Sequence, residues 1–166
     1  MTEVRAAVPA DADAVARVHV RSWRATYRGL VDQQYLDDLD AGAVASRYTF
    51  GRVGLRLPST LVAVDDSTIC GMVTTGLSPL PNFGELMAIY VDPAYLRTGV
   101  GRALMTAARE RLRGVGVAGA LLWVLDGNVA AQRFYERDGW RFDGARRIAT
   151  FGASPVEQLR YRLARV

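Results

Sequence analysis

Hydrophobic and polar residues along this chain repeat with two periods, one typical of helices and one typical of strands. Apolar residues recur at helical spacing in Gly101–Arg113 and Asn128–Asp138, which predicts an amphipathic helix in each segment. The short apolar run Ala118–Leu125 predicts a buried strand. Other stretches favour further strands: Glu3–Val8, Thr60–Val64, Ile69–Gly76, Glu85–Val91, Trp140–Arg147 and Val156–Leu163.

Helical segments are also predicted in the first third of the chain. One helix is expected to run to about Arg24, with Asp11 as its N-cap. Asp32–Leu39 and Ala43–Phe50 are predicted to be short helices, and the polar run 65–67 is predicted to be the turn of a hairpin. Helices interspersed with strands in this order predict a mixed α/β fold, a sheet flanked by helices.

Length and composition limit the possible classes of protein. A chain of 166 residues, half of them hydrophobic, is enough for one domain, which we expect to span residues 1–166. The only cysteine, Cys70, excludes an intramolecular disulfide and a cysteine-only metal site, and no metal is expected. With no apolar run of membrane-spanning length and no secretion signal, a soluble cytoplasmic protein without a membrane partner is expected.

The basic residues are all arginine. There are 21 of them against 17 acidic residues, a net charge of +4, and the chain has no lysine. GC-rich coding sequence and an anionic partner are both compatible with this composition. The arginines are scattered rather than clustered, which argues against a nucleic-acid partner.

A glycine loop lies between a predicted strand and a predicted helix. Gly99 and Gly101 let the backbone turn sharply and let an anion approach the peptide N–H groups at the start of the helix. The loop suits phosphate, although a simple tight turn would use the same residues. A dinucleotide fingerprint would need Gly or Ala where Leu104 stands, and a Walker loop would need the lysine that the chain lacks.

Two segments together resemble the GCN5-related N-acetyltransferase (GNAT) superfamily. Val91–Leu104 resembles its acetyl-CoA loop, Arg/Gln-x-x-Gly-x-Gly/Ala, and Asn128–Trp140 resembles its Asn-x-x-Ala-x-x-Phe-Tyr-x-x-x-Gly-Phe/Trp helix. Glu85–Val91 resembles the strand that leads into the loop. The opening of the chain resembles bacterial members through His19, Ser22, Trp23 and Tyr27. The likeness covers nearly the whole chain.

The resemblance implies both a fold and an activity. The fold would be a single N-acetyltransferase domain whose mostly antiparallel, twisted sheet has splayed middle strands flanked by helices. The activity would move an acetyl group from acetyl-CoA to a primary amine of a small molecule or a peptide N-terminus, by direct attack in a ternary complex. A non-catalytic acyl-CoA-binding sensor or interaction domain stays open as the alternative, and so does a homodimer formed by the last strands.

The resemblance also assigns residues to cosubstrate binding. The assigned residues are Ile89, Tyr90, Val91, Leu96, Arg97, Thr98, Gly99, Val100, Gly101, Arg102, Asn128, Ala131, Phe134 and Tyr135. Leu96 departs from the family pattern, which has Arg or Gln there, and Arg97 or Arg102 could supply the missing charge. Asn128 is also a favoured N-cap residue, a role compatible with cosubstrate binding.

By the same resemblance, Tyr135 is the candidate acid for the CoA thiolate and Glu85 the candidate base. Ordinary pKa values put proton transfer from Tyr to a thiolate uphill by roughly 2 kcal/mol, so Tyr135 is expected to stabilise the thiolate by a hydrogen bond. An unshifted Glu85 is too weak a base for a lysine-like amine, so a water relay, a raised pKa or a neutral amine is needed. Packing for Tyr135 and a solvated charge for Glu85 are the structural alternatives.

Three residues near the start of the chain are candidates for the acceptor pocket: His19, Trp23 and Tyr27. Aromatic residues at these positions would equally suit the core, and a lone histidine on a helix is more often packed or solvated than catalytic. No motif in the sequence identifies the acceptor.

Overall fold

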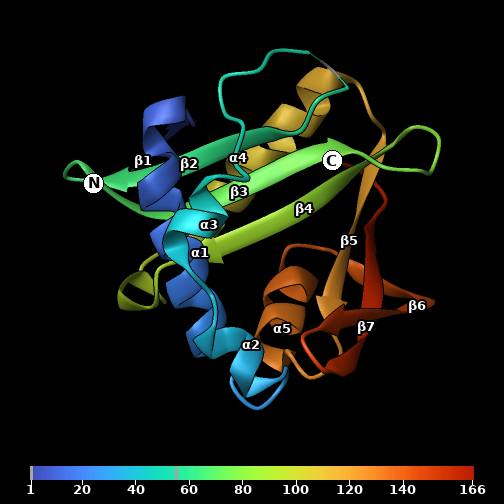
Figure 1. Ribbon diagram of the computed structural model, residues 1–166. Helices are drawn as coiled ribbons and strands as arrows, with labels where there is room; N and C mark the ends of the chain where they lie inside the picture. The colour runs from blue at the N-terminus through green and yellow to red at the C-terminus, as the bar shows by residue number, and fades with distance from the viewer. Residues whose placement is uncertain (1, 55) are drawn as a thin grey trace.

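The computed structural model describes residues 2–54 and 56–166 and places seven strands in one sheet, in the order β1-β2-β3-β4-β5-β7-β6. All neighbouring strands are antiparallel except β4 and β5, which are parallel (Figure 1). The strands are β1 (Thr2–Ala6), β2 (Ser59–Asp65), β3 (Thr68–Leu77), β4 (Phe83–Val91), β5 (Gly119–Leu125), β6 (Arg141–Phe151) and β7 (Ser154–Leu163). The α-helices are α1 (Ala12–Thr26), α2 (Gln33–Asp37), α3 (Ala41–Ala45), α4 (Val100–Val115) and α5 (Val129–Arg137).

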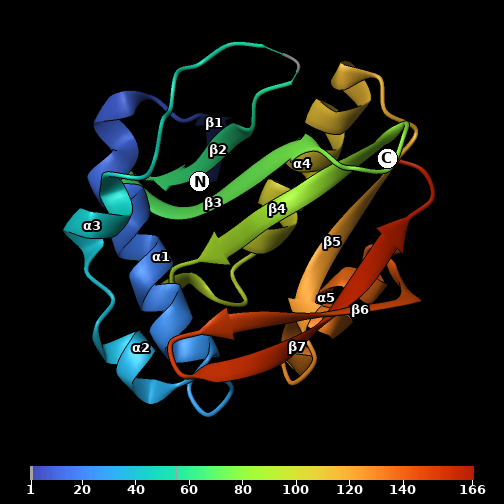
Figure 2. The same ribbon diagram turned by 45° about the vertical axis from the view of Figure 1, so that its right-hand side comes forward.

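Helices cover both faces of the sheet (Figure 2). On one face, Leu104 and Leu112 of α4 and Tyr135 of α5 pack in the main core with inward residues of the strands. On the other face, Val15 of α1 packs against β2 and β3. Because side chains alternate along a strand, a strand covered on both faces supplies apolar residues to both layers, as the uninterrupted apolar sequence of β5 does.

The middle strands β4 and β5 pair only at their beginnings and then separate. Phe83–Glu85 is in register with Gly119–Leu121, and β4 then bulges at Met87, which has no partner residue in β3. A β-bulge bends its strand and increases the local twist. The mostly antiparallel sheet with splayed middle strands is therefore confirmed, and the splay leaves one edge of β4 unpaired beyond Glu85.

Several local predictions are confirmed and one helix is misplaced. The hairpin between β2 and β3 turns at Asp66 and Ser67, which have φ of 44° and 68°. Asp11 is the N-cap residue of α1, as predicted, but its side chain bonds no N–H of this helix, because its carboxylate binds Arg5 at 2.7 Å and accepts from the Val8 N–H at 2.9 Å. The helix predicted at Ala43–Phe50 lies earlier, at Ala41–Ala45, because Asp40 caps it through the Ala43 N–H.

Cys70 lies in the core between the sheet and α4, fully buried, with its Sγ 3.5 Å from the Ala63 carbonyl oxygen. Within the described ranges, no three or more His, Cys, Asp or Glu side chains are grouped to hold a metal ion. In the same part of the chain, no helix has the length and apolar character needed to cross a bilayer.

Candidate active site

The glycine loop reaches α4 through two left-handed residues. Arg97 has φ of 63° and Gly99 has φ of 92°, so the chain reverses direction before Val100, the first helical residue. The first N–H groups of a helix have no partner within it, and no side chain of the described residues caps α4 at Gly99. Leu96, which replaces the usual Arg or Gln, is 58% exposed. The loop therefore presents bare, positively polarised N–H groups to solvent.

The two sequence motifs meet at this helix N-terminus. A Cβ atom built on Gly101 would lie 3.5 Å from the ring of Phe134, so α5 covers the first turn of α4. Asn128 caps α5 by accepting from the Ala131 N–H at 3.3 Å, which fixes where the helix starts. The segments are about thirty residues apart in sequence, and the packing of Phe134 on Gly101 makes them one surface.

The unpaired edge of β4 offers backbone groups to the gap between β4 and β5. Asp92 donates its N–H to the Cys70 carbonyl at 2.8 Å, and alternate residues of an antiparallel strand hydrogen-bond to the same neighbour. The register then turns Tyr90 towards β3, whereas the N–H and C=O groups of Ile89 and Val91 point into the gap. Of the cosubstrate-binding residues that the resemblance assigns to β4, Ile89 and Val91 have backbone groups that face the gap, and Tyr90 does not.

Tyr135 is held in the core beside this gap. Its ring packs against those of Phe134, Trp140 and Tyr161. Burial, with a smaller contribution from Tyr90, raises the pKa of Tyr135, so its phenol stays protonated at neutral pH. In the described part of the chain its hydroxyl makes no hydrogen bond, and the oxygen is not among the fully enclosed polar atoms. Packing of the Tyr135 ring in the core is therefore compatible with a hydroxyl that can donate a proton.

Glu85 lies where β4 and β5 begin to separate. It is half-buried, and burial raises the pKa of its carboxyl while the nearby Arg147 opposes that shift. No side chain in the described ranges forms a salt bridge with it. A carboxylate with these properties is a stronger base than an exposed glutamate and is free to accept a proton.

The three residues expected in the acceptor pocket lie together on the α1 side of the sheet. The ring centroids of His19 and Trp23 are 5.2 Å apart, and those of Trp23 and Tyr27 are 4.8 Å apart. His19 Nδ1 lies 2.8 Å from the Tyr48 hydroxyl, and burial, together with Arg47, lowers the pKa of His19 to about 4. Its imidazole is therefore neutral at pH 7.

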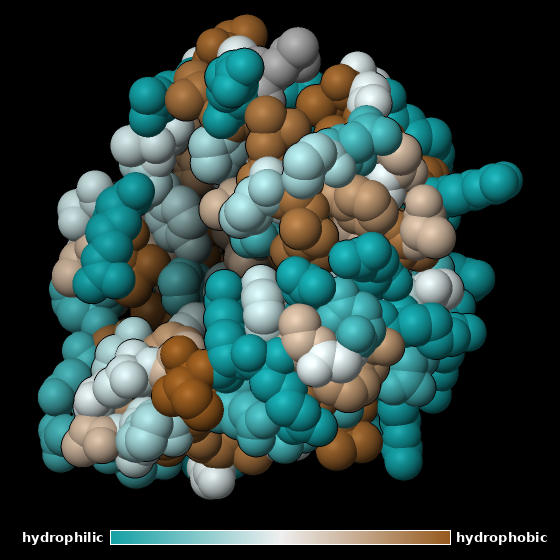
Figure 3. Space-filling model, turned by 90° about the vertical axis from the view of Figure 1, so that its right-hand side faces the viewer, coloured by the Kyte–Doolittle hydropathy of each residue, from teal (hydrophilic) through white to brown (hydrophobic). Residues whose placement is uncertain are grey.

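Tyr90 joins the same aromatic group, with its ring centroid 4.8 Å from that of His19. Burial raises the pKa of Tyr90 to about 12, and the nearby Trp23 indole opposes this shift. The two groups are not hydrogen-bonded, because Trp23 Nε1 has no hydrogen-bond partner among the described residues. Figure 3 shows a hollow between the layer of α1 and α3 and the sheet, above the β6–β7 hairpin. The aromatic group lies on this side of the sheet and provides an apolar wall.

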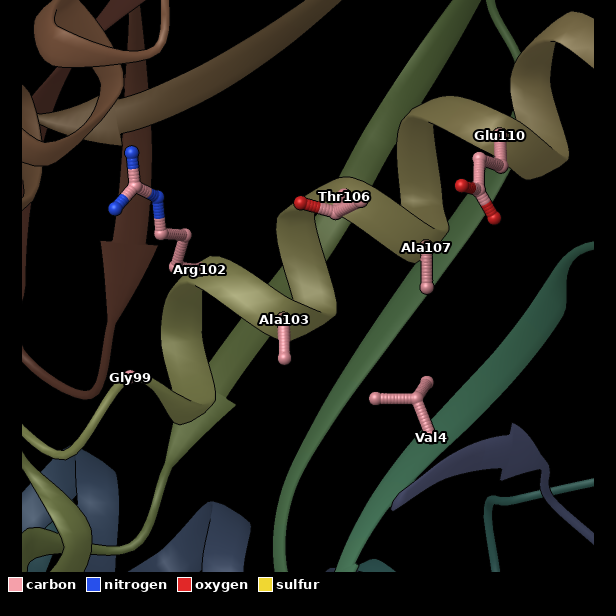
Figure 4. Close-up of a pocket in the computed structure, with 7 residues that line it drawn as sticks. All are labelled: Val4, Gly99, Arg102, Ala103, Thr106, Ala107 and Glu110. Carbon is pink, nitrogen blue, oxygen red and sulfur yellow. The ribbon is translucent and has the colours of Figure 1, made fainter. Parts of the chain in front are cut away.

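A separate groove of about 510 Å³ runs along the outer side of α4. Figure 4 shows Ala103 and Ala107 pointing towards Val4 of β1, with Arg102 extending away from them. Its lining residues are Val4, Gly99, Arg102, Ala103, Thr106, Ala107 and Glu110. The groove includes neither Tyr135 nor Glu85, and it meets the glycine loop at Gly99 and Arg102.

Sequence reasoning did not identify Trp123 and Arg147. Arg147 lies over the Trp123 ring at 4.2 Å, near Glu85. Neither residue belongs to a recognisable motif, and they are separated by 24 positions. Only the pairing of β5, β7 and β6 brings them together.

Comparison with known proteins agrees with this architecture. The family model described as "Acetyltransferase (GNAT) family" matches residues 19–140. An uncharacterized N-acetyltransferase, YuaI of Bacillus subtilis, is 32% identical over 132 residues, which cover 77% of this chain and 74% of the relative. The spermidine N(1)-acetyltransferase of Thermoplasma acidophilum is 24% identical over 146 residues, covering 85% of this chain and 89% of that protein.

Solved structures show the same fold. The PaiA N-acetyltransferase of Thermoplasma acidophilum, solved in complex with coenzyme A, superposes with a TM-score of 0.74 at 19% identity and covers 99% of both chains. The ribosomal-protein-S18-alanine N-acetyltransferase of Escherichia coli gives a TM-score of 0.69 at 21% identity, covering 98% of this chain and 93% of the other.

Proposed function

The chain belongs to the acetyltransferase (GNAT) family and is an acyltransferase, and from this premise we propose a specific reaction. Residues 1–166 form one N-acetyltransferase domain that moves the acetyl group of acetyl-CoA to a primary amine of a small molecule or a peptide N-terminus. The amine attacks directly while both substrates are bound. The observation that carries the proposal is the uncapped N-terminus of α4 beside a gap between two strands, with a protonated phenol at that gap.

The diphosphate of acetyl-CoA would bind at the start of α4. The N–H groups from Gly99 to Arg102 lie where the helix dipole favours an anion, and Gly99 permits the left-handed turn that exposes them. Arg97 and Arg102 supply positive charge in place of Leu96. Thr98, whose hydroxyl donates to the Tyr95 carbonyl, and Val100 complete the loop.

The pantetheine arm would lie along the free edge of β4. Ile89 and Val91 turn their backbone groups into the gap, so an extended amide-containing arm can pair there as an added strand. The Ile89 N–H can then polarise the thioester carbonyl as the oxygen gains negative charge. Asn128, Ala131 and Phe134 would form the opposite wall, from α5.

The chemical step would use Tyr135 and Glu85. The amine nitrogen forms a bond to the carbonyl carbon, and the carbon–sulfur bond then breaks, giving an N-acetyl product and the CoA thiolate. Glu85 accepts the proton that the nitrogen loses, directly or through water, and Tyr135 donates a hydrogen bond or a proton to the sulfur. An acceptor amine with a pKa near 8 suits this base, because about a tenth of it is neutral at pH 7.

The acceptor would enter from the hollow on the α1 side. Trp23, Tyr27 and His19 would line its apolar wall, and the neutral imidazole of His19 would add no positive charge to repel an amine. The acceptor would therefore reach the thioester from the face opposite α4 and α5.

Two measurements on the purified full-length chain test the proposal. Calorimetry with coenzyme A and acetyl-CoA measures cosubstrate binding, and release of the CoA thiol in the presence of a panel of primary amines measures turnover. We expect Tyr135→Phe to lower kcat by about 10- to 100-fold while acetyl-CoA affinity is kept. Absence of turnover with every amine, despite tight acetyl-CoA binding, would contradict the proposed reaction.

A further inference from the structure

Arg147 differs from the other arginines of strands β6 and β7. Arg146 pairs with Glu157 at 2.9 Å, and Arg160 and Arg162 approach Asp143 at 2.7 Å and 3.5 Å. Arg141 donates to backbone carbonyls. Over residues 2–54 and 56–166, Arg147 forms no salt bridge and donates only its Nε–H, to the Gln158 side chain. Its two terminal nitrogens are therefore free to bind a ligand.

The position of the Arg147 guanidinium is fixed despite the missing salt bridge. One face lies 4.2 Å from the centroid of the Trp123 ring, and Nε donates to Gln158 Oε1 at 2.6 Å. Stacking and a hydrogen bond at Nε leave the outer edge of the guanidinium as a two-pronged donor. That geometry matches a carboxylate, which accepts two parallel N–H bonds.

Arg147 faces the acceptor side of the sheet. On β5, Leu122 and Val124 belong to the core with α4, so Trp123 points to the opposite face, as does Leu125, which packs with Trp23 of α1. Because Arg147 stacks on Trp123, its guanidinium lies on this same face. The hollow proposed for the acceptor opens on this side of the sheet (Figure 3).

Glu85 is the charge of opposite sign that acts on Arg147. Each influences the ionisation of the other, yet the two do not approach within the 4.0 Å of a salt bridge. A positive and a negative group that are close but unpaired complement a molecule carrying both charges. A zwitterion would place its carboxylate on Arg147 and its amino group on Glu85.

We propose that the acceptor is an amine with a neighbouring carboxylate, such as a free α-amino acid, whose carboxylate binds Arg147 and whose amino group lies at Glu85. This inference rests on the proposed acetyl transfer and names the substrate class for it. A polyamine fits less well, because it carries no carboxylate for Arg147 and would bring further positive charge towards this arginine.

Paired acceptors test the proposal on the full-length protein. Each of the twenty amino acids is compared with its primary amide, which keeps the amine and removes the negative charge. We expect kcat/KM to favour the acid by at least about tenfold for the preferred side chain, and Arg147→Gln to reduce this preference about 10- to 100-fold, mainly through KM. Arg147→Lys should restore part of the preference. Arg146→Gln is the matched control, because it removes the same charge from the neighbouring position, on the opposite face of β6.

Product binding separates this inference from the proposed reaction. Calorimetry measures binding of N-acetyl amino acids to the protein saturated with coenzyme A, and this needs no turnover. Binding that Arg147→Gln abolishes supports the carboxylate site even if no acceptor is acetylated. The carboxylate site would be overturned, while acetyl transfer stands, if amides or alkylamines are acetylated as well as the acids and Arg147→Gln leaves the relative kcat/KM values unchanged. Absence of both acid turnover and product binding would also overturn it.

Discussion

The junction of β4 and β5 depends on the absence of a side chain at position 119. A Cβ atom placed on Gly119 would lie 2.5 Å from the Leu163 carbonyl oxygen and 2.5 Å from Cε1 of Phe83. Ordinary contact begins at 3.4 Å, so Gly119→Ala requires these neighbours to move by about 0.9 Å. The oxygen belongs to the backbone of β7, and Phe83 is the register partner of Gly119 in β4. The clash therefore falls at the point where the two middle strands meet.

The expected cost of Gly119→Ala is about 3 kcal/mol, the upper end of the range for overpacking, because a paired backbone cannot rotate away as a side chain can. With a urea m-value of about 2 kcal/mol/M, the unfolding midpoint falls by on the order of 1.5 M. Urea unfolding followed by circular dichroism measures this shift. We also expect weaker acetyl-CoA binding, because the separation of β4 and β5 shapes the proposed pantetheine site.

Gly114→Ala is the matched control. Gly114 lies near the end of α4, and a Cβ atom there meets nothing within 4 Å. Alanine favours the helix, so this change should stabilise the protein by roughly 0.5–1 kcal/mol. If the free energy of unfolding of Gly119→Ala lies within 0.5 kcal/mol of that of the unchanged protein, the close approach at the strand junction does not constrain the fold, and the reasoning is refuted.

Three further predictions concern the site. The pKa of His19 falls from 6.5 to about 4 on folding, so up to roughly 3 kcal/mol of stability, present above pH 6.5, is lost as pH falls towards 4. Urea unfolding of the unchanged protein and of His19→Gln at pH 7 and pH 4.5 measures this loss. If both proteins lose the same free energy of unfolding, the prediction is contradicted. Gly99→Ala forces alanine to φ of 92°, so it should cost about 1 kcal/mol of stability and weaken coenzyme A binding in calorimetry. Gly101→Ala is the control, because its Cβ atom meets Phe134 at an ordinary 3.5 Å and the fold should be kept. Equal stability of the two variants would rule out the role of the left-handed turn. Because burial raises the pKa of Glu85, kcat/KM should fall with decreasing pH at a higher pH than for an exposed glutamate. Glu85→Gln should remove this acidic limb of the pH–kcat/KM profile. A profile that the substitution leaves unchanged would exclude Glu85 as the base.

The sequence predicted most helices and strands because the periodicity, turn and capping signals for each lie within the segment itself or next to it. Gly99 before α4 and Asn128 before α5 act on adjacent backbone, so the starts of both helices could be read from the sequence. Asp11 is the N-cap residue as predicted, but the sequence did not reveal that its carboxylate binds Arg5, a partner in β1 that capping rules ignore. The helix at Ala41–Ala45 was predicted two residues too late because the N-cap at Asp40 was not recognised.

By itself, the sequence determined that two motifs for an acyl-CoA site are present, since spacing along the chain places glycines before a helix and Phe134 beside Tyr135. Only the tertiary structure decided which backbone groups of β4 are free, because this depends on the register with β3 and on how early β5 diverges. It also decided that Arg147 lies over Trp123 near Glu85, without a salt bridge to any of the described residues. Pairing between strands far apart in sequence sets such neighbours, and the periodicity within one strand carries no information about its partner.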